Sequence, residues 1–145
     1  MRAKPFFIVF FAVAALLGAV SVYMSATIDK ADKAISAFVS PDGKYKAVRT
    51  MFSGGGASPF CFDSISVLLA VYPDDIVERN KSYEMFSAPC DAPEKRATSP
   101  KIEWLSPTAL QISYSAKTAG FNEKKAVMKP LDVTKVVHVT FVARD

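Results

Sequence analysis

The fold class that this sequence predicts is mainly β: an N-terminal transmembrane or signal helix followed by a small antiparallel β sandwich or curled sheet of about six strands. Two patterns predict it. Residues 5–24 carry no charged side chain, whereas from Ser40 onward β-branched and aromatic residues alternate with polar ones between Pro, Gly and Asp. The chain has 145 residues, 50% of them hydrophobic, and two cysteines. This composition excludes a multidomain enzyme, a disordered tail and a cysteine-dense mini-protein.

The leader is the strongest signal in the sequence. Arg2 and Lys4 precede residues 5–24, and a helix of that length, at about 1.5 Å per residue, spans about 30 Å, the thickness of the hydrocarbon core of a bilayer. Positive charge before this run, and none after it until Lys30, predicts a cytoplasmic N-terminus and export of the rest of the chain. We expect residues 1–26 to be an uncleaved transmembrane anchor, in contact with the membrane through residues 5–24, or a cleaved signal peptide.

The charge of the exported part argues against a nucleic-acid partner. Because Arg2 and Lys4 belong to the leader, residues 27–145 hold 16 of the 18 basic residues and all 14 acidic ones. A nucleic-acid-binding domain needs a clustered basic face, whereas this part of the chain is nearly neutral. We therefore expect no nucleic acid among the partners.

A short connector is expected after the leader. Apolar residues recur at helical spacing from Ile28 to Phe38, with charged residues between them. This spacing predicts a helical stalk over residues 27–38. The exported β domain then comprises residues 39–145.

The first strands of that domain follow a turn. In Ser40-Pro41-Asp42-Gly43 the proline presets φ and the glycine takes a conformation that other residues resist. Alternating residues predict strands over 44–52 and 60–72, joined by a Gly-rich connection into an antiparallel hairpin. A third strand is expected over residues 82–87.

A second hairpin follows a Pro-rich loop. Residues 101–105 and 109–115 alternate around the turn Ser106-Pro107-Thr108, and residues 132–143 predict a long closing strand. An aromatic residue, a Ser-Pro turn and an alternating strand occur in this order twice, from Phe38 and from Trp104. This echo favours two similar hairpins packed into one small sandwich or curled sheet.

Three segments of the sequence carry a resemblance to known proteins. They are Ser40-Pro41-Asp42-Gly43-Lys44-Tyr45-Lys46-Ala47-Val48, then Asp63-Ser64-Ile65-Ser66-Val67-Leu68, and then Ile102-Glu103-Trp104-Leu105 with Leu110-Gln111-Ile112-Ser113-Tyr114. Their pattern resembles that of a group of short, uncharacterised bacterial exported proteins, and is similar to a single blade of the propeller in TolB-like periplasmic proteins. The resemblance implies a bacterial envelope protein and carries over no catalytic or binding residue.

The leader and the resemblance together predict the location. With an uncleaved leader, the chain is a single-pass protein of the bacterial inner membrane, with its N-terminus in the cytoplasm and its domain in the periplasm. A cleaved leader would release a periplasmic or secreted domain.

The two cysteines are expected to form a disulfide. Cys61 and Cys90 are the only cysteines, and an exported pair meets an oxidising compartment. A redox pair would need the close Cys-x-x-Cys spacing that lowers the pKa of a thiol, and this pair lacks it. The expected bridge stabilises the fold and ties the Pro-rich loop to the second strand.

The sequence predicts a contact surface rather than a catalytic site. His138 is the single histidine, and the Gly-rich loop lacks the Gly-Lys-Ser/Thr ending of a phosphate-binding loop. We expect no catalytic residue, no cofactor and no metal. Aromatic residues around a glycine-rich turn suit an interface. The candidate interface residues are Phe52, Gly54, Gly55, Gly56, Phe60 and Phe62.

These features predict a membrane-tethered envelope protein that acts by contact with another, unidentified envelope protein. One form of this function is an immunity or inhibitor protein that blocks an envelope-acting toxin. An accessory subunit of a membrane complex, with contacts made by the leader, is the main alternative. A small periplasmic hydrolase is a third, less favoured interpretation.

Overall fold

The computed structural model of the chain describes residues 32–54, 60–90, 100–118, 121–123 and 125–144. The predicted leader, residues 1–26, and the first part of the predicted stalk lie outside these ranges. Within the described ranges, no helix has the length and hydropathy needed to cross a membrane.

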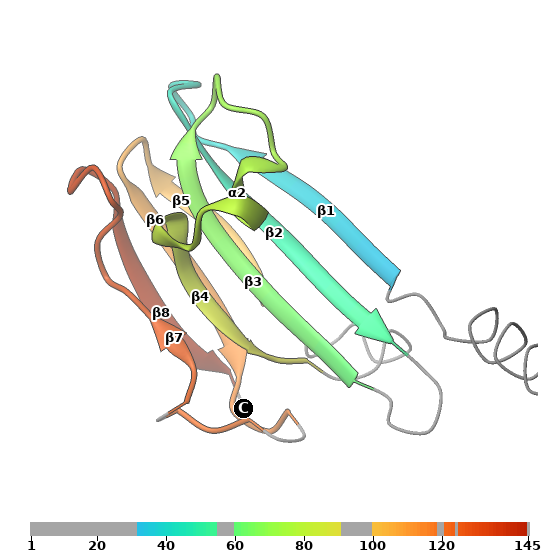
Figure 1. The fold of residues 1–145 in the computed structure, drawn as a ribbon. Coiled ribbons are helices and arrows are strands. Elements are labelled where there is room, and N and C mark those ends of the chain that lie inside the picture. Colours follow the sequence, from blue (N-terminus) through green and yellow to red (C-terminus); the bar gives the residue numbers. More distant parts are fainter. Residues whose placement is uncertain (1–31, 55–59, 91–99, 119–120, 124, 145) are drawn as a thin grey trace, which may run out of the picture. The chain divides into compact units, whose positions relative to one another are not determined.

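The described residues form two β-sheets, so the mainly β prediction is confirmed (Figure 1). The larger sheet has five strands in the order β1-β2-β3-β4-β7, and the smaller has three in the order β5-β6-β8. The strands are β1 (Asp32–Val39), β2 (Tyr45–Gly54), β3 (Phe60–Leu69), β4 (Glu84–Pro89), β5 (Lys101–Ser106), β6 (Ala109–Ser115), β7 (Val127–Met128) and β8 (His138–Arg144). Two short helices, α2 (Ile76–Arg79) and η1 (Lys81–Tyr83), lie between β3 and β4.

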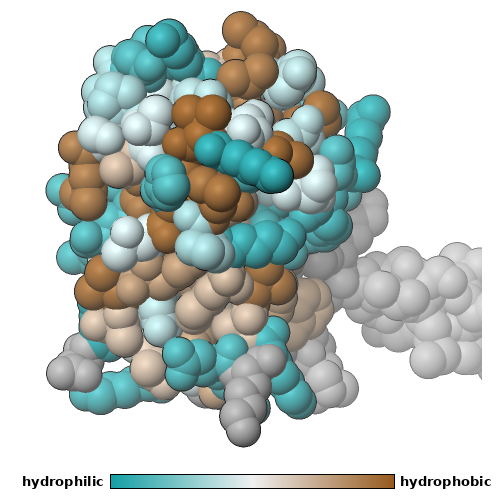
Figure 2. Space-filling view, turned by 90° about the vertical axis from the view of Figure 1, so that its left-hand side faces the viewer, coloured by the Kyte–Doolittle hydropathy of each residue, from teal (hydrophilic) through white to brown (hydrophobic). Residues whose placement is uncertain are grey.

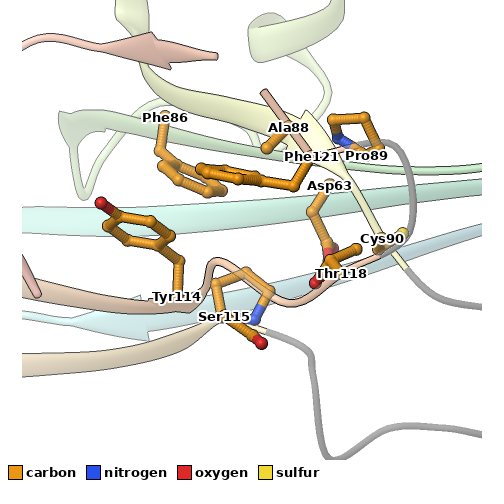
Figure 3. Close-up of a pocket in the computed structure, with 10 residues that line it drawn as sticks. Asp63, Phe86, Ala88, Pro89, Cys90, Tyr114, Ser115, Thr118 and Phe121 are labelled. Atoms are coloured by element: carbon orange, nitrogen blue, oxygen red, sulfur yellow. The ribbon is translucent and has the colours of Figure 1, made fainter. Parts of the chain in front are cut away.

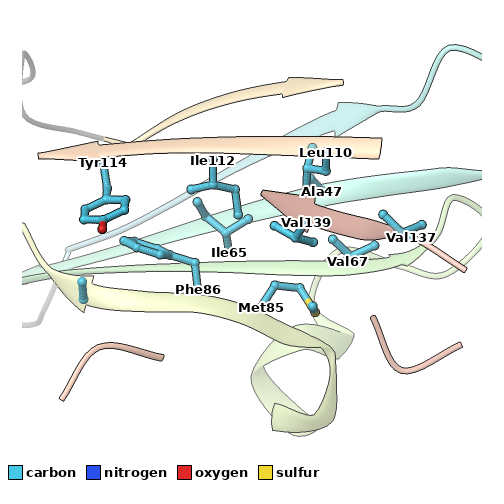
Figure 4. Packing of buried hydrophobic residues seen from close by; sticks show 11 residues of the cluster. Ala47, Ile65, Val67, Met85, Phe86, Leu110, Ile112, Tyr114, Val137 and Val139 are labelled. Atoms are coloured by element: carbon cyan, nitrogen blue, oxygen red, sulfur yellow. The ribbon is translucent and has the colours of Figure 1, made fainter. Parts of the chain in front are cut away.

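The main core lies between the two sheets, which makes the domain a sandwich. Successive side chains of a strand point to opposite faces, and the inward-facing set of each sheet is apolar. Figure 4 shows Ile65 and Phe86 of the larger sheet facing Ile112 and Tyr114 of the smaller one. The buried members of this core are Ala47, Ile65, Val67, Met85, Phe86, Ala88, Leu110, Ile112, Tyr114, Val137 and Val139.

Both predicted hairpins are confirmed. β2 pairs with β3 in antiparallel fashion, and β5 pairs with β6. The two hairpins belong to different sheets and face each other across the core. The part of the chain that the structure describes has eight strands rather than about six, because β1 and β7 were not predicted as strands.

The predicted helical stalk is wrong from Asp32 onward. Residues 32–39 form strand β1, which pairs with β2 from Asp32↔Ser53 to Val39↔Lys46. β1 is an edge strand, exposed at seven of its eight residues, so neither of its faces imposes a clear alternation. Pairing with β2 therefore overrides the weak helical spacing.

The prediction of a wholly antiparallel sheet is also wrong. β8 runs parallel to β6, from Ala109↔His138 to Ser115↔Arg144. A parallel pair needs a long crossover connection. The connection between β6 and β8 provides it, and β7, within this connection, joins the edge of the larger sheet by pairing with β4.

The predicted closing strand over residues 132–143 begins later, at His138, because Asp132 organises a tight turn. Asp132 Oδ1 accepts hydrogen bonds from the backbone N–H groups of Val136 (2.8 Å) and Val137 (2.7 Å). Its Oδ2 accepts from the backbone N–H (3.0 Å) and the hydroxyl (2.6 Å) of Thr134. Burial raises the pKa of Asp132, but these hydrogen bonds outweigh burial and lower the pKa below its usual value.

The edge at which β7 and β8 lie is closed by apolar side chains. Figure 2 looks at this edge and shows hydrophobic residues gathered over its middle, with hydrophilic residues above and below. Phe121, Ala126, Met128 and Phe141 are partly buried and pack against the core. These side chains complete the core at this edge.

The outer face of the larger sheet, which points away from the core, is covered at one end. Val48 and Leu68 pack there against Val77 of α2, and Figure 1 shows α2 lying across the sheet. The connection that carries α2 is fastened by Lys46, whose Nζ contacts Asp74 Oδ1 at 2.5 Å and donates to the carbonyl oxygen of Tyr72 at 2.5 Å. We call this the covered end.

Candidate functional site

The other end of the same outer face carries three phenylalanines, Phe52, Phe60 and Phe62, which we call the aromatic cluster. Phe52 lies opposite Phe62 in the pairing of β2 with β3, and Gly54 lies opposite Phe60. Ile65 of β3 points into the core, and Phe60 and Phe62 precede it by odd numbers of positions, five and three. All three rings therefore stand on the outer face.

The ring of Phe60 lies against the backbone of Gly54. A Cβ atom placed on Gly54 would lie 2.4 Å from Phe60 Cε1 and 2.8 Å from Phe60 Cζ. Both distances are shorter than real contacts allow, so any other residue at position 54 would displace the ring. Gly54, predicted as part of the interface, thus leaves the space that the ring of Phe60 occupies.

The cluster is open to solvent. Phe60 is 53% exposed and Phe62 is 39% exposed, while Phe52 is half-buried between them and β1. Scattered exposed apolar residues are ordinary, but adjacent aromatic rings on neighbouring strands form a patch, and such patches mark contact surfaces.

Two residues that were not predicted flank the cluster. Lys33 of β1 lies opposite Phe52, and Pro89 of β4 lies opposite Phe62, so one row across the sheet reads Lys33, Phe52, Phe62, Pro89. Lys33 Nζ forms an ion pair with Glu78 of α2. The cluster is therefore apolar on its open side, because its neighbouring cation is already paired.

The predicted disulfide is confirmed. Cys61 and Cys90 are bonded, with their Cα atoms 4.9 Å apart, and the backbone N–H of Cys90 donates to the carbonyl oxygen of Cys61 at 3.0 Å. Cys61 stands between Phe60 and Phe62 in the chain and points to the inner face. The bridge therefore fixes the strand end that displays the aromatic cluster.

A buried ion pair lies on the inner face near the disulfide. Asp63 is 1% exposed, and its Oδ1 accepts a hydrogen bond from Arg49 Nε at 2.7 Å. Its Oδ2 has no hydrogen-bond partner among the described residues. Burial raises the pKa of Asp63, with the Arg49 guanidinium acting in the opposite direction. A charged residue at this inward position of β3 was the sequence signal for this pair, and sequence reasoning missed it.

Asp63 borders a cavity of about 10 Å³. Figure 3 shows Phe86, Tyr114 and Phe121 beside it, with Thr118 near the Asp63 carboxylate. A volume of about 10–15 Å³ holds one water molecule. This cavity is therefore too small for a metabolite.

The sequence also singles out His138, Gly55 and Gly56. His138 is exposed at the start of β8 and lies opposite Ala109. Over the ranges that the structure covers, no group of three or more His, Cys, Asp or Glu side chains could hold a metal ion. Gly55 and Gly56, predicted as interface residues, lie outside the described residues.

Comparison with protein-family models, with curated proteins and with solved structures finds no match. The resemblance to bacterial exported proteins therefore stays a prediction.

Proposed function

We propose that this chain is a membrane-tethered protein of the bacterial envelope, and that its exported domain acts by binding another protein through the aromatic cluster. One observation carries the proposal: the outer face of the larger sheet is covered at one end and leaves Phe60 and Phe62 exposed at the other. Rings fixed on a sheet lose little conformational freedom on binding, which favours their use as anchors.

The charges of the domain support an apolar contact. Residues 27–145 are nearly neutral, and Lys33, the cation beside the cluster, is paired with Glu78. Binding through apolar burial depends only weakly on salt, whereas binding through charges falls as salt screens them. We expect the complex to persist at high ionic strength.

An immunity or inhibitor protein is one form of this function. A small tethered domain with an exposed aromatic patch could occupy and block an envelope-acting toxin. The alternative is an accessory subunit of a membrane complex, in which the leader makes the contacts and the domain is secondary.

Photo-crosslinking in intact cells tests the proposal. Phe62 of the full-length protein is replaced by p-benzoylphenylalanine, and the matched control carries the same group at Leu105, which is 57% exposed on the smaller sheet. We expect a discrete adduct with a protein from position 62 and none from position 105. Equal adducts from both positions, or none from position 62, would contradict the proposal.

Exchange of the leader distinguishes the proposed function from the accessory-subunit alternative. Residues 1–26 are replaced by an unrelated transmembrane anchor in the protein with the crosslinker at position 62. If the adduct persists, the domain makes the contact. If it disappears while the protein is still exported and oxidised, the leader makes the contact and the accessory-subunit alternative holds.

A further inference from the structure

The register of β1 fixes the end of the sheet at which the chain enters the domain. Asp32, the first residue of β1, lies opposite Ser53, and Lys33 lies opposite Phe52. Val39, at the other end of β1, lies opposite Lys46. Eight residues of a strand extend roughly 26 Å at about 3.3 Å each. The chain therefore enters the larger sheet beside the aromatic cluster, and the opposite end lies a full strand length away.

The connection to the predicted membrane segment is short. That segment ends at residue 24, and β1 begins at Asp32. Residues 25–31 can span at most about 25 Å when fully extended. Because β1 takes the place of most of the predicted stalk, an anchored chain holds the aromatic cluster close to the bilayer surface.

We infer that the partner of the aromatic cluster is an integral membrane protein, contacted at the outer surface of the bilayer that holds the leader. This inference rests on the proposed function. A tether of this length confines the cluster to a thin layer above the membrane, where it raises the effective concentration of membrane-embedded partners over freely diffusing ones. The complementary surface on the partner is apolar and weakly charged.

The composition of the cluster favours a protein over the lipid surface itself. Membrane-interface belts use Trp and Tyr, which combine an apolar ring with a polar group, and anionic lipids attract unpaired Lys and Arg. The cluster consists of three phenylalanines, and Lys33 beside it is paired with Glu78. These residues suit a dry, apolar pocket of another protein.

A spacer between the leader and β1 tests the inference in intact cells. The full-length protein carries p-benzoylphenylalanine at position 62 and a rigid (EAAAK)-type helical spacer of about 20 residues after residue 26, which lifts the domain by about 30 Å. The matched variant carries a flexible Gly/Ser spacer of equal length, which lets the domain return to the surface. A further control places the crosslinker at Val71, which is 85% exposed at the far end of the sheet.

We expect the rigid spacer to reduce the adduct about tenfold or more, and the flexible spacer to retain most of it, because only the rigid spacer removes the cluster from the layer above the membrane. The adduct of the parent protein should stay in the membrane pellet after alkaline carbonate extraction, even when the anchor of the tethered protein is cut off by an engineered protease site. Position 71 should give no adduct. Formation of the disulfide, detected by the mobility of the protein on non-reducing gels, shows that each variant folds.

Three results would overturn the inference. An adduct that survives the rigid spacer, or a partner that carbonate extracts, places the contact away from the membrane but leaves the proposed function intact. An adduct with lipid alone assigns the cluster to the bilayer. The absence of any adduct from position 62, with the disulfide formed, removes both the inference and the proposed function.

Discussion

The two ends of the outer face of the larger sheet are built from the same strands and differ in what covers them. At the covered end, Val48 of β2 and Leu68 of β3 pack beneath Val77 of α2. At the open end, Phe52 and Phe62 of the same two strands have no helix above them among the described residues, and Phe62 is 39% exposed. The connection between β3 and β4 therefore covers the apolar side chains at one end of this face and leaves those at the other end exposed.

The two ends should respond differently to substitution. A side chain at the covered end contributes to the free energy of unfolding, because unfolding exposes it to water. A side chain at the open end is partly in water already, so its apolar surface is mainly available for binding. Four predictions, in order of decreasing effect on stability, test this difference between the two ends.

Removal of the disulfide should loosen the open end. Cys61 lies between Phe60 and Phe62, and the bridge spans a sequence separation of 29 residues. On the loop-entropy model, a loop of about 30 residues contributes about 3–4 kcal/mol. We expect the double change Cys61→Ser and Cys90→Ser to lower the free energy of unfolding by that amount, as measured by urea denaturation.

Hydrogen exchange should show where this loss falls. In the protein without the disulfide, the amides of residues 60–63 should lose protection at a lower denaturant concentration than those of residues 66–69, because the bridge lies at the open end. An equal loss of protection at both ends would show that the bridge does not act locally on the cluster.

A matched pair of substitutions in β3 probes the two ends separately. Leu68→Ala removes a buried side chain at the covered end and should cost about 2–4 kcal/mol of stability. Phe62→Ala, at the open end of the same strand, should cost about 1 kcal/mol or less, since its ring is partly exposed, yet it should abolish binding of the partner. Thermal unfolding measures the loss of stability, and pull-down of the partner by proteins without a crosslinker at position 62 measures binding. Similar stability losses for both variants would refute the division.

The turn at Asp132 provides a reference outside both ends. Asp132 accepts four hydrogen bonds, and Asp132→Asn should lower the free energy of unfolding by about 1–3 kcal/mol near neutral pH. Because folding lowers the pKa of Asp132, its stabilisation is present above the unfolded value of 3.8 and is lost as pH falls through the folded value. The difference in free energy of unfolding between the wild type and the variant should therefore become smaller below pH 3.8.

Urea denaturation at a series of pH values measures this gap. Binding through position 62 should be unchanged in Asp132→Asn at neutral pH, since the turn belongs to neither end. A gap that widens in acid would contradict the assignment of these hydrogen bonds to the ionised carboxylate.

The smallest effect on stability is expected from Gly54→Ala. The added Cβ would lie 2.4 Å from Phe60 Cε1, so the ring must swing away, which a surface side chain does at a cost of about 1 kcal/mol or less. All three phenylalanines remain, but their arrangement changes. We expect crosslinking from position 62 to fall at least about tenfold, consistent with about 1.4 kcal/mol or more of lost binding. Full binding would show that the partner needs only hydrophobicity, not this geometry.

The sequence predicts elements whose signal is local. Both hairpins combine alternating residues with a recognisable turn, so β2, β3, β5 and β6 were predicted close to their observed bounds. The disulfide followed from the count of cysteines and the leader. The positions of Phe52, Phe60 and Phe62 near the glycine-rich connection indicated a surface, and the hairpin register then places all three on one face.

Other elements depend on contacts that no local pattern records. β1 is exposed on both faces, so only its pairing with β2 makes it a strand. The parallel register of β8 depends on where the crossover returns, and the closing strand was predicted too long because Asp132 looks like any polar residue of an alternating segment. The contact between Gly54 and the ring of Phe60 depends on the strand register that places the two residues opposite each other.

The parallel pairing of β8 has a consequence for the order of assembly. Val137 and Val139 belong to the main core, yet they follow every other strand in the chain, and β8 docks beside β6 across a long separation. Contacts between distant residues form late and slowly. Both hairpins can therefore pair before β8 arrives, but the space between the two sheets is filled only when Val137 and Val139 dock. The last strand of the chain thus completes the packing of the sandwich.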